Sequence, residues 1–315
     1  MLRCEGALVR GSGPNSLSPK ITGTSSMDAI LNQAFAGLSM ASILLMVALG
    51  LAIIYGAMGV INLAHGEFVM LGAYVTWAMQ AYLGVGLLLA LPVVFLSIGL
   101  MGWLIERGIV HRLYKRPLDT ILATWGIGIV LQQLVRMGIG SESRFVAGPK
   151  LLEGNLVIGN VYMSNYRIFV IVFSLAVLAG TWALLARTEF GKKLRAVIQN
   201  REISECYGIR AEKVYALTFA YGAGLAGVAG ALIAPLVSTT PSMGTYLVVD
   251  AFLVVIIGGV GSIAGTALAA GAVGEATAFF SMLMNDTLGR ISVLVAIILF
   301  IRFWPNGLFP QSVRR

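Results

Sequence analysis

Three polar side chains, Asn62, His65 and Glu67, stand close together in a stretch of sequence that is otherwise apolar. Residues 34–58 before them and 68–105 after them contain no Asp, Glu, Lys, Arg or His. Ionisable groups at membrane depth are costly, so they usually serve function. A polar break there is tolerated only where protein buries it or water reaches it. We therefore take these three residues as candidates for lining a solute path.

A structural role for the same residues is an equal alternative. Glu67 could lie in the first turn of the following helix and offset its unpaired N–H groups, while His65 could be a packed, hydrogen-bonded imidazole. Catalysis and metal binding are not expected, because His65 and Glu67, two positions apart, cannot share a helix face. The second histidine, His111, lies elsewhere, and Cys4 and Cys206 form no ligand cluster. We expect no cofactor and no metal.

The composition is that of a membrane protein. The 315 residues are 58% hydrophobic and 11% charged, whereas soluble domains carry about 25% charged residues. Mean hydropathy is +0.87. We therefore predict an all-α polytopic integral membrane protein. At about 20 residues per span, its length suits about eight or nine transmembrane helices.

The net charge of +8 does not indicate nucleic acid, because the basic residues gather in a few loops. Of the 22 Lys and Arg, 14 fall in three segments: four in 107–116, seven in 187–213 and three in 302–315. Cytoplasmic loops of membrane proteins carry such an excess. These segments, and with them the C-terminus, are predicted to be cytoplasmic.

The chain divides into one transmembrane domain and two tails. Residues 1–27 are rich in Gly, Ser and Pro and are predicted to be disordered, with Met27 as an alternative start of the protein. The transmembrane domain covers 28–310, and 311–315 form a C-terminal tail. The predicted spans are 28–58, 68–83, 86–106, 120–140, 166–186, 215–236, 266–285 and 289–303, with 141–165 facing outside.

The basic loop 187–214 is the most charged part of the chain. We predict two short helices in it, the second ended by Gly208 in the left-handed conformation. The following span, 215–236, is dense in glycine. Its small residues favour close packing within this chain or between chains, at Gly222, Gly224, Gly227 and Gly230.

A second glycine-rich break, 258–265, resembles the first and also follows an apolar segment. Broken segments at matching positions of two halves point to a translocation site, and we predict a repeat in which both halves have the same orientation. Ser262 in this break and Glu275 in the next helix join the candidates for the path. Asp250 is expected to cap the short helix that follows it.

Taken together, Gly59–Gly66 with Glu67, the loop Gly191–Gly208 and the turn Gly258–Gly265 resemble the permease subunits of ABC importers for branched-chain amino acids and other small amides. The resemblance covers about residues 30–310. The run 114–127 is closer to the urea-transporting branch of that family. The resemblance implies a bacterial inner-membrane protein that moves urea or a related small amide inward. A branched-chain amino acid is the alternative substrate, and an ATP-independent channel or carrier is a further one.

The resemblance also implies partners. Such permeases insert a cytoplasmic loop into a cleft of the ATP-hydrolysing subunit through the pattern Glu-Ala-Ala, three residues, Gly. Here Glu202, Ser204 and Gly208 keep the spacing without both alanines, and Arg195 precedes them in the same loop. No phosphate-binding Gly-x4-Gly-Lys-Ser/Thr loop is present, so ATP hydrolysis is expected in separate subunits. A second, related permease chain and an extracytoplasmic solute-binding protein complete the expected assembly, which lies in membrane lipid.

Overall fold

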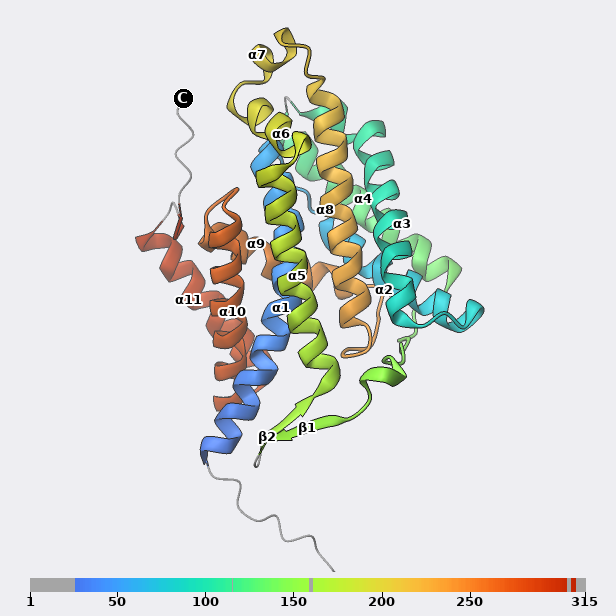
Figure 1. Ribbon diagram of the computed structural model, residues 1–315, viewed down its shortest axis with the longest axis vertical. Helices are drawn as coiled ribbons and strands as arrows, with labels where there is room; N and C mark the ends of the chain where they lie inside the picture. Colours follow the sequence, from blue (N-terminus) through green and yellow to red (C-terminus); the bar gives the residue numbers. More distant parts are fainter. Residues whose placement is uncertain (1–25, 115, 159–160, 305–306, 310–315) are drawn as a thin grey trace, which may run out of the picture.

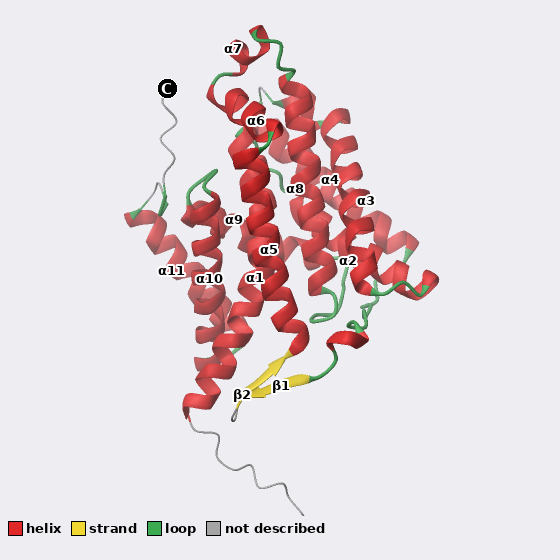
Figure 2. Ribbon diagram, viewed as in Figure 1, coloured by secondary structure: helices red, strands yellow, loops and turns green. Residues whose placement is uncertain are grey.

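The computed structural model describes the chain except residues 1–25, 115, 159–160, 305–306 and 310–315. The predicted tails 1–27 and 311–315 therefore lie outside the described residues, apart from Ser26 and Met27, which begin the first helix. The described residues form a bundle of helices with one small hairpin of strands (Figures 1 and 2). The expectation of a helical, polytopic membrane protein is confirmed.

The helices and strands follow one another in this order: α1 Ser26–Met58, α2 His65–Leu83, α3 Leu87–Gly108, a 3-10 helix Val110–Leu113, α4 Pro117–Gly138, a 3-10 helix Lys150–Leu152, β1 Asn155–Ile158, β2 Val161–Ser164, α5 Asn165–Arg187, α6 Glu189–Gln199, α7 Arg201–Cys206, α8 Ala211–Ile233, α9 Met243–Gly258, α10 Ile263–Leu283 and α11 Asp286–Phe303.

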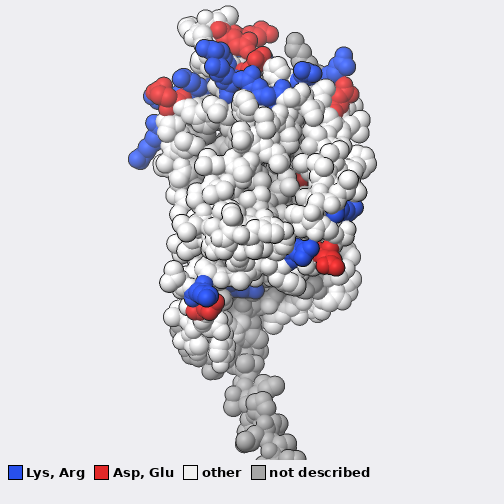
Figure 3. Space-filling view, turned by 90° about the vertical axis from the view of Figure 1, so that its right-hand side faces the viewer, with Lys and Arg blue, Asp and Glu red and all other residues white. Residues whose placement is uncertain are grey.

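The bundle has one strongly basic end, formed around α6 and α7. Figure 3 shows Lys and Arg gathered there and a broad band below them with almost no charge on the visible face. Among the described residues, six helices are long and apolar enough to cross a membrane: α1, α3, α4, α5, α8 and α10. The apolar helices α2, α9 and α11 have 19, 16 and 18 residues and are shorter or more polar. The count of eight or nine spans therefore stays a prediction.

Helix α8 is the centre of the fold, because α1, α2 and α3 all pack around it. The predicted glycine face allows this, and it serves packing within the chain. Gly222 faces Gly50 of α1, while Gly227 faces both Gly72 of α2 and Ile98 of α3. Without side chains at these positions the backbones approach closely, as in other membrane helix pairs.

Alanine at Gly222 is expected to destabilise the protein by about 1–3 kcal/mol, the usual cost of an overpacked core. Its Cβ would lie 2.7 Å from the Gly50 carbonyl oxygen. Gly126→Ala is the matched control, because no atom lies within 4 Å of a Cβ at that position of α4 and alanine favours a helix. Thermal unfolding in detergent measures the effect. An unfolding midpoint for Gly222→Ala equal to that of Gly126→Ala would contradict it.

The connection between α4 and α5 contains structure that the sequence analysis missed. Strands β1 and β2 pair antiparallel, from Asn155 with Ser164 to Ile158 with Val161. The backbone N–H of Tyr162 donates to Asn32 Oδ1 of α1 at 3.0 Å, which attaches the hairpin to the bundle. Strands of four residues are too short to show the alternation by which a strand is recognised in sequence.

The two short helices predicted in the basic loop are confirmed as α6 and α7. Asn200 caps the N-terminus of α7, since its Oδ1 accepts from the Ile203 N–H at 2.9 Å. Gly208 has the predicted left-handed conformation, with φ +78°. The Ile209 N–H donates to the Ser204 carbonyl at 3.0 Å, which ends the helix.

Candidate functional site

The first break turns the chain back into the bundle. Helix α1 ends at Met58 near the basic end, where Ala57 packs with residues of α6. Yet the His65 Nε2 atom lies 3.0 Å from the carbonyl oxygen of Val47. At 1.5 Å per residue, Val47 is about 16 Å back along α1. Residues 59–64 therefore run back beside α1, and α2 begins inside the bundle.

Local sequence explains this path. Gly59 has φ +65°, a conformation that glycine adopts without steric penalty, and it ends α1. Asn62 then makes a tight turn, because its Oδ1 accepts from the Ala64 N–H at 3.1 Å. Asn62 and His65 are fully buried, and Glu67 is 3% exposed.

Helix α9 lies along this break and brings a second helix N-terminus into the bundle. Gly244 in its first turn approaches Gly66 so closely that a Cβ on Gly244 would lie 2.6 Å from the Gly66 carbonyl carbon. Beyond its other end, Gly261 approaches Gly56 of α1. The first turns of α2 and α9 thus meet, and the N-terminus of each helix carries a partial positive charge.

Glu67 joins three helices at this meeting point. Its Oε1 accepts from Gln132 Nε2 of α4 at 2.8 Å. The same nitrogen lies 3.0 Å from Thr245 Oγ1 of α9. Thr124 of α4 contributes further, since its Oγ1 accepts from the Leu63 N–H at 3.2 Å. Thr245 is exposed, so the cluster reaches the surface of the bundle.

The sequence analysis missed Thr124, Gln132 and Thr245. Thr124 and Gln132 carry a usable signal, because they stand with Gly128 at intervals of four residues and so share one face of an apolar helix. Gly128 lets that face approach: a Cβ there would lie 3.3 Å from Cγ of Glu67. Thr245 gave no comparable signal.

Three buried polar atoms of the break have no hydrogen-bond partner among the described residues: Asn62 Nδ2, His65 Nδ1 and Glu67 Oε2. Buried polar groups are nearly always hydrogen-bonded, so these atoms retain capacity to bind a polar solute. The structural alternative is also seen, because Glu67 lies in the first turn of α2 and His65 contacts Val47.

The structure brings Asn62, His65 and Glu67 together but leaves Ser262 and Glu275 apart from them. Ser262 begins α10, where its Oγ accepts from the Gly265 N–H at 3.1 Å. Glu275 of α10 faces the first part of α1, because a Cβ on Gly37 of α1 would lie 3.0 Å from the Glu275 Oε2 atom. Their place in a solute path stays a prediction.

The expected capping role of Asp250 is wrong. Helix α9 begins at Met243, so Asp250 lies in its middle and caps nothing. The run Met243–Val249 is apolar or small and continues the helix ahead of Asp250. Asp250 instead lines a cavity between α9, α10 and α11.

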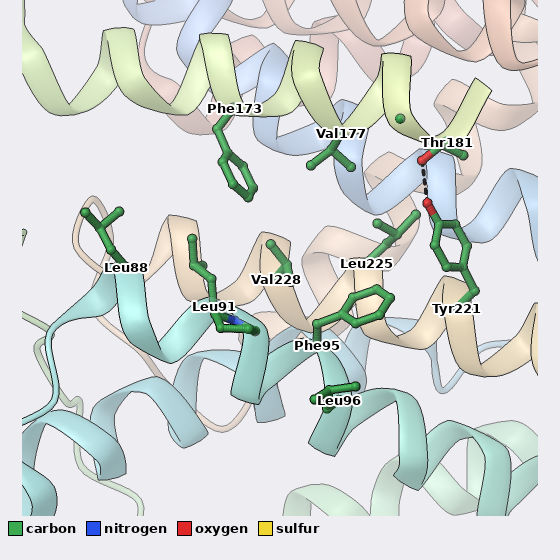
Figure 4. A pocket seen from close by; sticks show the side chains of 12 residues that line it. Leu88, Leu91, Phe95, Leu96, Phe173, Val177, Thr181, Tyr221, Leu225 and Val228 are labelled. Carbon is green, nitrogen blue, oxygen red and sulfur yellow. Dashed lines mark hydrogen bonds between the residues drawn. The ribbon is translucent and has the colours of Figure 1, made fainter. Parts of the chain in front are cut away.

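Another cavity, of about 590 Å³, lies between α3, α5 and α8 (Figure 4). Its walls are apolar, and the hydroxyl groups of Thr181 and Tyr221, 2.7 Å apart, bond to each other. None of the candidate residues lines it. Apart from these two hydroxyl groups, its side chains are apolar.

The candidate coupling residues lie at the basic end. Ser204 is buried, and its Oγ donates to the Asn200 carbonyl at 2.8 Å. Glu202 and Gly208 are exposed, and the Arg195 guanidinium donates to the Leu185 carbonyl. Two residues missed in the sequence stand out on α7, because large apolar side chains exposed outside the apolar band mark interaction surfaces: Ile203 is 55% and Tyr207 83% exposed.

Aromatic contacts connect α7 to α3. The Arg201 guanidinium lies 5.8 Å over the ring of Tyr215, and that ring lies 5.4 Å from the ring of Tyr114. The Tyr114 hydroxyl donates to Glu106 of α3. Burial raises the pKa of Tyr114 far above its usual range, so the hydroxyl keeps its proton and remains a donor.

The chain is similar in sequence to known transport permeases. The family described as "Branched-chain amino acid transport system / permease component" matches residues 33–303. The high-affinity branched-chain amino acid transport permease BraD of Pseudomonas aeruginosa is 29% identical, over 88% of this chain and 95% of the relative. LivH of Escherichia coli, described likewise, is 31% identical over 88% and 94%. A probable LivH of Methanocaldococcus jannaschii is 27% identical over 79% and 80%. No solved structure matches the chain.

Proposed function

This chain belongs to the family of branched-chain amino acid transport permease components, and from that premise we propose that it is the membrane-spanning subunit of an ATP-driven importer for an aliphatic amino acid. The observation that carries the proposal is the meeting of α2 and α9 inside the bundle. There Glu67, Gln132 and Thr245 form a polar cluster that reaches the surface. Broken helices whose N-termini meet near the midplane are the usual frame of a transport site.

Two considerations favour an amino acid over urea, the substrate favoured by the sequence analysis. The relatives are named for branched-chain amino acids. Residues of the run 114–127, which pointed to urea, make hydrogen bonds within the protein. Thr120 Oγ1 donates to the Leu113 carbonyl at 2.9 Å, and Thr124 Oγ1 accepts from the Leu63 N–H in the break. These residues therefore support urea less than their sequence alone suggested.

Uptake by the complete transporter in proteoliposomes tests the proposal. We expect ATP-dependent accumulation of labelled leucine that excess urea does not inhibit. Accumulation of urea without leucine would replace the amino acid with urea as substrate. Leucine uptake that continues without the ATP-binding subunits would instead favour a channel or carrier.

The exposed face of α7 is proposed to dock on an ATP-binding subunit, with the basic end in the cytoplasm. Ile203 and Tyr207 supply apolar contact area, and Glu202 and the Gly208 turn lie beside them in the chain. Arg195 of α6 is proposed to contribute to the same contact. A solute-binding protein is proposed to deliver the amino acid at the opposite end.

A second, related permease chain is proposed to complete the transporter, because two ATP sites require two coupling loops. The glycine face of α8 is used within this chain, so the partner must pack elsewhere. Helix α11 is suitable, because Val295 is 50% and Leu299 55% exposed.

Cysteine crosslinking in the purified complex is expected to join Val295→Cys or Leu299→Cys to that second chain, in a background with Cys4 and Cys206 replaced by serine. Leu96→Cys on α3, also exposed, is the control and should remain free. A self-crosslinked dimer without a second permease would refute the heteromeric arrangement.

A further inference from the structure

A second polar feature lies in the cavity between α9, α10 and α11, where Asp250 is half-buried and Arg290 is exposed. The cavity has a volume of about 210 Å³, and it contains one acidic and one basic side chain, Asp250 of α9 and Arg290 of α11. Pockets for drug-sized ligands occupy about 300–1,000 Å³. This one therefore suits a smaller solute.

Asp250 and Arg290 face this cavity without joining each other. Neither belongs to an ion pair within 4.0 Å in the described part of the chain, although the charge of Arg290 acts on the Asp250 carboxylate. A salt bridge that merely locked α9 to α11 would bring the two groups into contact. Opposite charges held apart across a cavity instead match a solute that carries both charges.

The rest of the cavity wall is mainly aliphatic. Leu253, Val273, Leu294 and Ile297 come from all three helices. An aliphatic wall beside one anion and one cation fits the side chain, the ammonium group and the carboxylate of an aliphatic amino acid. Urea has no charge and no apolar side chain, so it would leave both groups and this wall without complementary partners.

Helix α9 carries residues of both the Glu67 cluster and the cavity. Thr245, Tyr246 and Val249 are exposed on that face, and Tyr246, Val249 and Asp250 line the cavity. Thr245 also lies beside Gln132 at the cluster. Thr245 of the cluster and Asp250 are therefore five residues apart on one helix, about 8 Å along its axis.

We propose that this cavity is a transport subsite at which Asp250 binds the ammonium group and Arg290 the carboxylate of an aliphatic amino acid. The inference rests on the proposed function and adds a site to it. In the membrane interior both solute charges need partners. Asp250 and Arg290 provide them midway along α9 and one turn into α11.

Protection of a cysteine inside the cavity tests the subsite. Thr277 lines the cavity, and Thr277→Cys is placed in the complete transporter with Cys4 and Cys206 replaced by serine. We expect leucine to slow the reaction of this cysteine with a small water-soluble thiol reagent. Urea should not slow it. Leucinamide, which lacks the carboxylate, and 4-methylpentanoate, which lacks the ammonium group, should protect at least tenfold less well than leucine.

Charge-removing variants separate the two contacts. Asp250→Asn should raise the leucine concentration needed for protection at least tenfold and abolish the advantage of leucine over 4-methylpentanoate. Arg290→Gln should do the same relative to leucinamide. Size-exclusion chromatography reports whether each variant complex is assembled, and the two variants, in different helices, provide independent tests.

Protection by leucine that both variants retain in full would overturn the subsite. So would equal protection by urea, or a cysteine at 277 that does not react at any stage of the ATP cycle. These results leave the proposed function standing whenever the unmodified complex still accumulates leucine. A complex that accumulates no leucine would refute the proposed function itself.

Discussion

Replacement of Glu67 by alanine is expected to lower ATP-driven uptake at least tenfold while the protein still reaches the membrane in normal amount. The carboxylate is the point at which α2, α4 and α9 are joined through Gln132. Its loss removes the hydrogen bond from Gln132, which contributes about 0.5–1.5 kcal/mol, and leaves Gln132 bonded to Thr245 alone. It also removes the buried Oε2 atom, which has no hydrogen-bond partner among the described residues.

Uptake per unit of membrane-inserted protein is the measurement. Glu142→Ala is the matched control, because Glu142 is exposed in the connection after α4 and should be neutral. Glu67→Gln should retain more activity than Glu67→Ala, since an amide oxygen can still accept from Gln132. Normal uptake by the alanine variant would show that transport does not need this side chain. Loss of the protein from the membrane would instead assign Glu67 to folding.

Valine at Gly208 is expected to abolish the stimulation of ATP hydrolysis by substrate while the membrane helices stay intact. Gly208 has φ +78°, where a β-branched residue is a steric outlier. No atom lies within 4 Å of a Cβ at this position, so the substitution acts through the backbone alone. It would change the end of α7 and thus the direction of the exposed Tyr207 beside it.

Gly208→Asn is the control, because asparagine tolerates the left-handed conformation far better than valine. We expect it to keep most of the coupling. The comparison is made on the reconstituted complex, with substrate-stimulated ATPase activity as readout and thermal unfolding in detergent as the check on folding. Unchanged stimulation in the valine variant would show that the end of α7 does not transmit the signal.

The sequence predicted the fold class well because the hydrophobic pattern is strong. Residues 34–58 and 68–105 lack charge, so their helices could hardly be missed, and Gly208 ended α7 as its conformational freedom suggests. The break at Asn62, His65 and Glu67 was also visible as polar residues in an apolar setting. Each of these signals comes from residues that are close together in the chain, so it can be recognised in the sequence alone.

What the sequence did not provide is the arrangement across helices. Glu67 meets Gln132 and Thr245 in the cluster. These two residues lie 65 and 178 positions after Glu67 in the sequence, and no local sequence pattern connects them to it. Asp250 was misplaced because the start of α9 is fixed by the close approach of Gly244 to Gly66 rather than by a capping residue. The two breaks also differ in shape: the first runs back beside α1, while the second is a tight turn. The internal repeat therefore stays a prediction.

The return of residues 59–64 into the bundle has a consequence for biosynthesis. Insertion into a membrane selects segments by length and hydropathy, and α9, about 24 Å long at 1.5 Å per residue, is shorter than a hydrocarbon core of about 30 Å. Unpaired backbone groups are costly in lipid, and residues 59–64 need α4, where Thr124 accepts from the Leu63 N–H. The short helix α9 in turn packs against α1, α2 and α10. The spanning helices must insert first, and the polar junction at Glu67 closes last. Partly assembled chains would therefore expose the polar groups of this junction to lipid.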